Sequence, residues 1–494
     1  MKQPNIIMIL TDEHNGKVVH AGGDPWVRTP NMDRLAQNGA LMEHAYCNSP
    51  LCVPSRSSML TGLMPHTGGI FNNAQSLPSD RATFVHCLGA AGYETVLSGR
   101  MHFVGPDQRH GYEKRLVGDI TTAVLGVSFA ERRYGYFSKC AMPGRTGIER
   151  SGKGECSVMA YDLDVTDAAV EFLENRKEGR PLFLTVGLYG PHSPYVAPEE
   201  LFDYYYSILP EPEVMKEEDL DAMHPFERKF LKNRGLGHET AEEIKRVRAA
   251  YYGMVEYEDR LLGRIMDAAE RTLGLENTII LYTSDHGDGI GYHGLFWKSN
   301  MREESLRIPM IFSWKDKIPA GLRFQGLSCL LDISCTLTDF ASAPDLPGAE
   351  GISLKSYLLN GKDLPNDRPV ISEICDIKGE DPAAMIRKGQ YKYVSYYGYE
   401  NGCLYDLELD PSENHNLEND EKYACIKEEL KSQLEQVWDE DQVYRQRESF
   451  LPHMMLMREW AKKQNINLLY DEWNQEGERR NRNYLIVNKK KIFE

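Results

Sequence analysis

The chain has 494 residues, 41% hydrophobic and 27% charged, a balance typical of a large globular protein. Its formal net charge of −17 argues against nucleic acid as the main partner, because a phosphate backbone requires a basic face. No apolar run reaches the ~20 residues that span a bilayer, which predicts no membrane partner. Asp12 and Glu13 follow the first short apolar run directly, so no signal peptide is visible and we expect a cytoplasmic protein.

Short apolar runs alternate with helix-like stretches along the first part of the chain. Apolar runs at residues 5–10, 181–188, 277–283 and 308–313 lack a two-residue period, as strands do when a parallel sheet buries both of their faces. Helical patterns cover residues 162–176 and 246–272, and the charged residues 210–245 predict an exposed helical excursion. The alternation predicts an α/β domain with a mostly parallel sheet flanked by helices.

The pattern changes near residues 361–369, which are rich in turn residues. Strand-like segments follow at residues 384–395 and 402–407, separated by loops. We therefore predict a large domain at residues 1–369 and a smaller α+β subdomain with an antiparallel sheet, including a tail, at residues 370–494. The ten cysteines stand singly with no C-x-x-C pair, so most are expected to be free, buried thiols.

Acidic residues follow two of the predicted strands. Asp12 lies just past the first, and Asp285 and His286 lie just past the third. Open α/β sheets place their ligand sites at the carboxyl ends of such strands. Carboxylates favour Ca²⁺ or Mg²⁺, and the imidazole leaves Mn²⁺ open. For Asp12 alone a turn or helix-cap role fits as well, so the metal hypothesis depends on the three residues together.

The most informative segment is Cys52-Val53-Pro54-Ser55-Arg56. By itself it could be a buried cysteine before a proline turn. It resembles the C-x-P-S-R signature of formylglycine-dependent sulfatases, a family of the alkaline-phosphatase-like superfamily. Further segments resemble that family in its order, namely residues 99–102 (G-K-x-H), 191–195 (P-H-x-P), 284–298 and 404–417.

The resemblance implies an alkaline-phosphatase-like sandwich and a sulfuric ester hydrolase. It implies that a formylglycine-generating maturation enzyme, a transient partner, oxidises Cys52 to Cα-formylglycine. One hydroxyl of the hydrated aldehyde then attacks sulfur, and the second allows sulfate to leave. The implied metal ligands are Asp12, Cys52, Asp285 and His286, with Ca²⁺ favoured over Mn²⁺ or Mg²⁺. Glu13 departs from the common aspartate, and whether it reaches the ion or only orders its loop is left open.

A sulfate monoester is anionic, so the pocket must supply cations and hydrogen-bond donors, and the candidates to face the sulfate are Arg56, Arg100 and Lys298. The resemblance implies that His192, with Lys298 nearby, protonates the departing alcohol and that His102 takes the proton from the second hydroxyl. Arg100 replaces the usual lysine of the family. The expected catalytic residues are Cys52, Arg56, His102, His192 and Lys298, and the expected substrate-binding residues are Arg100, Lys298 and Asn73.

The expected substrate is a small organic or carbohydrate sulfate ester. Residues 51–52, 73–74, 102–108 and 110–113 resemble the choline-sulfatase branch, whereas residues 121–133 lack the tryptophan that would face a quaternary ammonium group. A phosphonate monoester or phosphodiester hydrolase of the same superfamily is the alternative. A non-catalytic binding protein is disfavoured, because nucleophile, ligands and cations are all present. The sequence leaves a homo-oligomer open.

Overall fold

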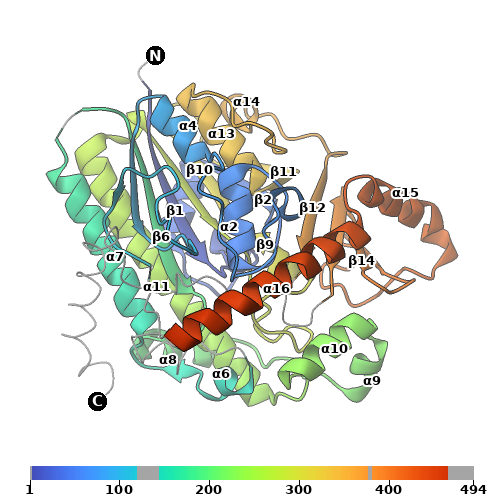
Figure 1. Ribbon diagram of the computed structural model, residues 1–494. Helices are drawn as coiled ribbons and strands as arrows, with labels where there is room; N and C mark the ends of the chain where they lie inside the picture. Colours follow the sequence, from blue (N-terminus) through green and yellow to red (C-terminus); the bar gives the residue numbers. More distant parts are fainter. Residues whose placement is uncertain (1–2, 120–143, 178, 376–380, 465–494) are drawn as a thin grey trace.

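The structure is a computed structural model that describes residues 3–119, 144–177, 179–375 and 381–464. Within these residues a nine-stranded sheet forms the centre of the molecule, in the order β11-β2-β10-β8-β1-β6-β3-β4 with β9 paired to β2 (Figure 1). All of its neighbouring pairs are parallel except those made by β10 and β9. The strands are β1 (Asn5–Asp12), β2 (Gly39–Tyr46), β3 (Glu94–Gly99), β4 (Lys114–Arg115), β6 (Leu182–Pro191), β8 (Thr278–Ser284), β9 (Arg307–Ile308), β10 (Met310–Ser313) and β11 (Leu322–Cys329).

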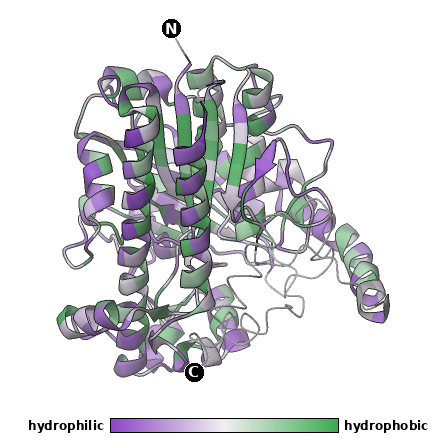
Figure 2. Cartoon of the chain, turned by 90° about the vertical axis from the view of Figure 1, so that its left-hand side faces the viewer, coloured by the Kyte–Doolittle hydropathy of each residue, from purple (hydrophilic) through white to green (hydrophobic). Residues whose placement is uncertain are grey.

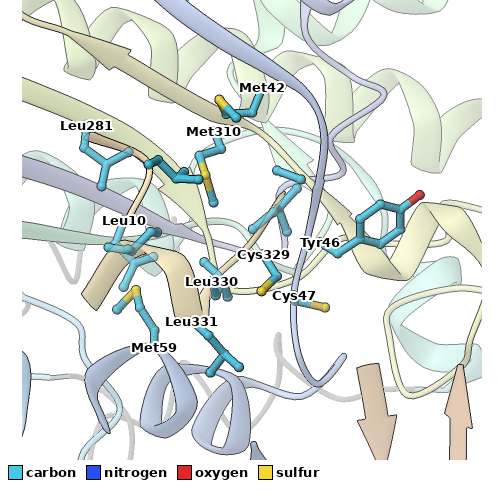
Figure 3. Packing of buried hydrophobic residues seen from close by; sticks show 14 of the residues in the cluster. Leu10, Met42, Tyr46, Cys47, Met59, Leu281, Met310, Cys329, Leu330 and Leu331 are labelled. Carbon is cyan, nitrogen blue, oxygen red and sulfur yellow. The ribbon is translucent and has the colours of Figure 1, made fainter. Parts of the chain in front are cut away.

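Helices cover both faces of this sheet. Alternate side chains of β1 serve two cores: Met8 and Leu10 pack with Met59 of α2, whereas Ile7 and Ile9 pack on the other face, where α7 and α11 lie. Figure 3 shows the first core, and Figure 2 shows the strands as a hydrophobic band behind the helices of the second face. The helices concerned are α1 (Pro30–Gln37), α2 (Cys52–Thr61), α4 (Phe84–Ala90), α7 (Ser157–Asn175), α11 (Ala241–Leu273) and α13 (Leu331–Ala341).

A second, antiparallel sheet follows in the order β12-β13-β14-β15. Leu430 and Leu434 of α15 pack on one of its faces, while Met385 and Tyr405 belong to the core of the large sheet. The boundary at residues 369–370 therefore stays a prediction, because the two sheets share a core. The elements are β12 (Pro369–Ile374), β13 (Ala383–Lys388), β14 (Tyr391–Tyr396), β15 (Cys403–Asp406), α15 (Ala424–Glu435) and α16 (Glu440–Gln464).

The expected α/β class and the second antiparallel sheet are confirmed, with two local corrections. The run at residues 308–313 is broken into β9 and β10 because Pro309, between them, has no N–H to donate. The run at residues 384–395 is a hairpin, in which Gly389 adopts the positive φ of a tight turn.

The charged excursion is helical, as expected, but Phe230 and Leu231 bury its inner side. Among the described residues no helix is both long and apolar enough to cross a bilayer. Nine cysteines are described, and seven of them are buried; Cys140 lies outside the described residues. The remaining elements are η1 (His20–Gly22), α3 (Pro65–Gly68), α6 (Arg145–Glu149), β5 (Gly152–Lys153), β7 (Val196–Ala197), α8 (Glu199–Ile208), α9 (Glu217–Ala222), α10 (Pro225–Arg234), η2 (Leu275–Asn277), α12 (Glu303–Leu306), α14 (Lys355–Asn360) and η3 (Glu421–Tyr423).

Candidate active site

The predicted site residues meet at the carboxyl edge of the large sheet. Asp12 ends β1, Arg100 follows β3, His192 follows β6 and Asp285 follows β8. These four strands are adjacent and parallel, so their carboxyl ends lie at one edge. Cys52 is the first residue of α2 and reaches the same place.

Four of the predicted metal ligands form one cluster. The Nε2 atom of His286 lies 3.3 Å from Cys52 Sγ, 3.8 Å from Asp12 Oδ1 and 3.7 Å from Asp285 Oδ1. His286 Nδ1 lies 3.0 Å from the carbonyl oxygen of Gly287, which can only accept, so Nδ1 carries the proton and Nε2 turns its lone pair toward the cluster. Two carboxylate oxygens and an imidazole lone pair facing one another in a buried site fit a divalent cation.

Arg56 holds the two aspartates in this orientation. Its Nε donates to Asp285 Oδ2 at 2.8 Å and its Nη2 to Asp12 Oδ2 at 3.1 Å, so the Oδ1 atoms are left for the cluster. Its Nη1 donates to the carbonyl oxygen of Arg100, and its side chain is only 1% exposed. The expectation that Arg56 faces the sulfate is therefore corrected: its donors are directed at the ligand carboxylates.

Arg100 connects the cluster of predicted ligands to His102. Its Nε donates to Asp12 Oδ2 at 2.5 Å, and its Nη2 lies 2.8 Å from His102 Nδ1. Burial raises the pKa of Asp12, but the charges of Arg100, His192 and Arg56 outweigh it and hold that pKa well below its usual value. The side chain of Arg100 also lies over the ring of Tyr189, 4.5 Å from its centroid.

His102 is held as a neutral imidazole. Burial, and then the charge of Arg100, lower its pKa well below the usual value. Because Arg100 can only donate, Nδ1 accepts and Nε2 carries the proton. A proton-accepting role for His102 therefore requires the contact with Arg100 to open. The backbone N–H of His102 donates to Asp119 Oδ2 at 2.8 Å.

Glu13 lies beside Lys298 and His192, and its carboxylate is within 4.8 Å of that of Asp12. Its Oε2 is 3.1 Å from Lys298 Nζ and 3.3 Å from His192 Nε2. Burial raises the pKa of Glu13 well above its usual value, although Lys298 opposes this. Burial and then Lys298 lower the pKa of His192 well below its usual value. Glu13 also adopts a positive φ of 69°, which a non-glycine residue rarely does.

Asn73 occupies a different place from the one expected for a substrate ligand. Its Oδ1 accepts from the backbone N–H of Val53 at 2.9 Å, in the first turn of α2. This contact fixes the turn that carries Cys52.

Two residues of the site were missed from the sequence. Asp119 fixes His102, and Tyr189 supports Arg100. Tyr189 stands two residues before the P-H-x-P segment at a strand end, a position that could have indicated it, whereas Asp119 carries no motif signal.

Comparison with known proteins identifies the family. The profile described as Sulfatase matches residues 4–341, and that described as N-sulphoglucosamine sulphohydrolase, C-terminal, matches residues 291–440. The choline-sulfatase of Rhizobium meliloti is 35% identical over 430 residues, which cover 84% of this chain and 82% of the relative. The N-acetylglucosamine-6-O-sulfatase of Bacteroides thetaiotaomicron is 27% identical over 498 residues, covering 88% of this chain and 86% of the relative.

Solved structures have the same architecture. One, in complex with its substrate D-glucosamine-2-N,6-O-disulfate, superposes with a TM-score of 0.71 at 25% identity, over 90% of this chain and 98% of the other. The phosphonate monoester hydrolase of Agrobacterium radiobacter superposes with a TM-score of 0.72 at 24% identity, over 87% and 95% of the chains, and shows the fold alone. With the matched profile covering most of the chain, we conclude that this protein is a sulfuric ester hydrolase of the sulfatase family with an alkaline-phosphatase-like fold.

Proposed function

We propose that the chain releases inorganic sulfate from a small organic or carbohydrate sulfate ester, with a nucleophile made from Cys52 and one divalent cation. The observation that carries the proposal is the position of Cys52 Sγ, 3.3 Å from His286 Nε2 and 3.7 Å from Asp12 Oδ1. The residue to be converted therefore stands inside the ligand cluster and not beside it.

Asp12, Asp285 and His286, with the side chain at position 52, would hold the cation, and the oxygen-rich set favours Ca²⁺ over Mn²⁺ or Mg²⁺. When bound, the cation would lower the pKa of a hydroxyl at position 52 and so supply a nucleophile at neutral pH. Burial, and then Asp12, raise the pKa of the Cys52 thiol to about 11, so the unmodified side chain is a protonated thiol. A protonated thiol is a poor nucleophile, whereas the hydrate of formylglycine offers one hydroxyl for attack on sulfur and a second for sulfate release.

The cationic side chains divide into two groups around that nucleophile. Arg100, on the β3 side, would hold the sulfate oxygens once its Nη atoms leave Asp119 and His102, and Lys298 would neutralise the same charge from the β8 side. His192 would protonate the departing alcohol, and Glu13 contacts both His192 and Lys298. His102 would receive the later proton once it separates from Arg100.

Choline sulfate is the second candidate, because the Rhizobium meliloti relative at 35% identity is a choline-sulfatase. The segment where an aromatic residue for the ammonium group was sought, residues 121–133, lies outside the described residues. The phosphonate monoester alternative is supported by a likeness of fold alone.

Protein made with and without a formylglycine-generating enzyme tests the proposal. Sulfate release from choline sulfate, glucosamine 6-sulfate and an aryl sulfate is compared with hydrolysis of an aryl phosphonate monoester. We expect turnover of a sulfate ester only after co-expression, in step with the mass change of the peptide that contains Cys52. Cys52→Ala should be inactive, and Cys52→Ser should stall as a sulfated enzyme, because it has no second hydroxyl. Full turnover by verified unmodified protein would refute the nucleophile, and preferred hydrolysis of the phosphonate would refute the substrate class.

A further inference from the structure

Two buried carboxyl groups lie beside Gly190, near the end of β6. Asp162 comes from α7 and Glu258 from α11, the two long helices on one face of the sheet (Figure 1). Asp162 is 0% exposed and Glu258 1% exposed, and both carboxyl groups lie against the backbone of Gly190. Neither has a part in the chemistry described above.

Asp162 uses both of its oxygens to hold the backbone of β6. Oδ1 accepts from the N–H of Tyr189 at 2.6 Å, and Oδ2 accepts from the N–H of Gly190 at 2.7 Å. An ionised carboxylate is the form that accepts at both oxygens, so a hydrogen bond between the two carboxyl groups would require the proton on Glu258. Burial raises the pKa of Asp162 to about 7, whereas burial and then Asp162 raise the pKa of Glu258 well above its usual value, so Glu258 is the member of the pair that keeps a proton more readily.

The chain leaves no room for a side chain between the pair and the strand. A Cβ atom at Gly190 would lie 2.2 Å from Glu258 Oε1. Glu258 therefore packs directly on the backbone that Asp162 holds, and the glycine at this position is needed for that approach.

Tyr189 transmits the position of this backbone to the site. Its ring centroid lies 4.8 Å from that of His192, at an interplanar angle of 65°, and 4.5 Å from the guanidinium carbon of Arg100. One ring thus contacts both the residue proposed to protonate the leaving group and the residue proposed to hold the sulfate.

We propose that Asp162, as an ionised acceptor, and Glu258, as its protonated donor, are a pair of positioning residues that holds the end of β6 and, through Tyr189, orients His192 and Arg100. The inference rests on the proposed function for the roles of His192 and Arg100. The location of the proton does not depend on it.

The kinetic test uses matured enzyme with two substrates, an alkyl sulfate and 4-nitrophenyl sulfate. Only the alkyl leaving group needs a proton, and general acid catalysis contributes roughly 10²–10⁴-fold. In Asp162→Asn one backbone N–H meets an amide N–H, so we expect kcat for the alkyl sulfate to fall at least about tenfold more than kcat for the nitrophenyl ester. Glu258→Gln keeps an N–H that donates to Asp162, so both rates should stay near those of the wild type.

Asp332→Asn is the matched control. The carboxylate of Asp332 also accepts from two backbone N–H groups, those of Cys329 and Ile352, but at the other end of the sheet. It should lower the melting temperature without changing the ratio of the two rates. If Asp162→Asn does not fold, Glu258→Met, which has no donor, replaces it and should show a weaker form of the same leaving-group dependence.

Infrared spectroscopy of folded protein tests separately whether Glu258 carries the proton. The difference spectrum between wild type and Glu258→Gln should contain the carbonyl band of a protonated carboxylic acid. The inference would be overturned if the spectrum contained no such band, or if Asp162→Asn lowered both rates equally. It would also be overturned if Glu258→Gln lowered the rate for the alkyl sulfate as much as Asp162→Asn does. A His192→Ala variant without leaving-group dependence would instead overturn the proposed role of His192, and the infrared result would still decide the pair.

Discussion

Arg56 is the residue whose removal should disturb the site most clearly, because it neutralises two buried aspartates at once. Arg56→Met keeps most of the apolar length of the side chain but leaves Asp285 Oδ2 without the donor that lies 2.8 Å away. Asp12 still has Arg100, so the uncompensated charge is that of Asp285. Breaking a buried pair from one side costs about 3–5 kcal/mol.

The assay is thermal unfolding in the presence of a chelator, so that no cation compensates the carboxylates. An unfolding entropy of about 2.1 cal/mol/K per residue over 494 residues is ~1 kcal/mol/K, so the melting temperature should fall by roughly 3–5 °C. Adding Asp285→Asn removes the orphaned charge, so the double variant should be less destabilised than the sum of the two single variants, by about 1–3 kcal/mol. Strict additivity would refute the view that Arg56 serves as the counter-ion of Asp285.

Three further results are expected. Arg100→Lys should keep substantial activity because it restores the charge, whereas Arg100→Ala should lose it; equal, wild-type-like rates for both would show that Arg100 does not face the substrate. Asp12→Ala and Asp285→Ala should each abolish activity and bound metal, measured by elemental analysis, with nearly unchanged circular dichroism; wild-type turnover by metal-free variants would contradict the ligand assignment. Burial raises the pKa of Glu304, but Lys17 outweighs it and lowers that pKa from 4.5 to about 2, so its stabilisation is present above pH 4.5 and lost as the pH falls toward 2. Glu304→Gln should therefore lose less stability than the wild type between pH 4.5 and 2 in thermal melts, and a parallel loss would argue against a role for this pair.

Much of the fold was predictable because it depends on local patterns. Residues 5–10 and 277–283 read as buried strands, and the structure places them in β1 and β8, which pair with each other. Strand direction was less accessible, since β10 runs antiparallel to both of its neighbours, and no short-range pattern records that. The shared core of the two sheets could not be predicted either, because no short-range pattern records which sheet a buried side chain packs against.

The site was predictable to the extent that its residues stand at strand ends within motifs. Asp12, Asp285 and His286 were expected to meet, and they do. The contacts of these residues were not predicted. Arg56 and Asn73 were expected to bind the substrate because they lie in motifs, and a motif does not record which atoms a side chain contacts. In the structure one donates to the ligand carboxylates and the other accepts from the first turn of α2.

The sequence by itself determined the family and the strand-end location of the site, and it supplied the nucleophile that we propose, because each is recorded in residue types at short spacing. Only the tertiary structure decided which atom faces which. It decided the tautomer of His286, the proton-bearing nitrogen of His102 and the contact between Asp162 and Glu258, which are far apart in the chain. Such contacts depend on how the helices pack against the sheet. Burial then strengthens each hydrogen bond and each charge interaction, because the interior has a low dielectric constant.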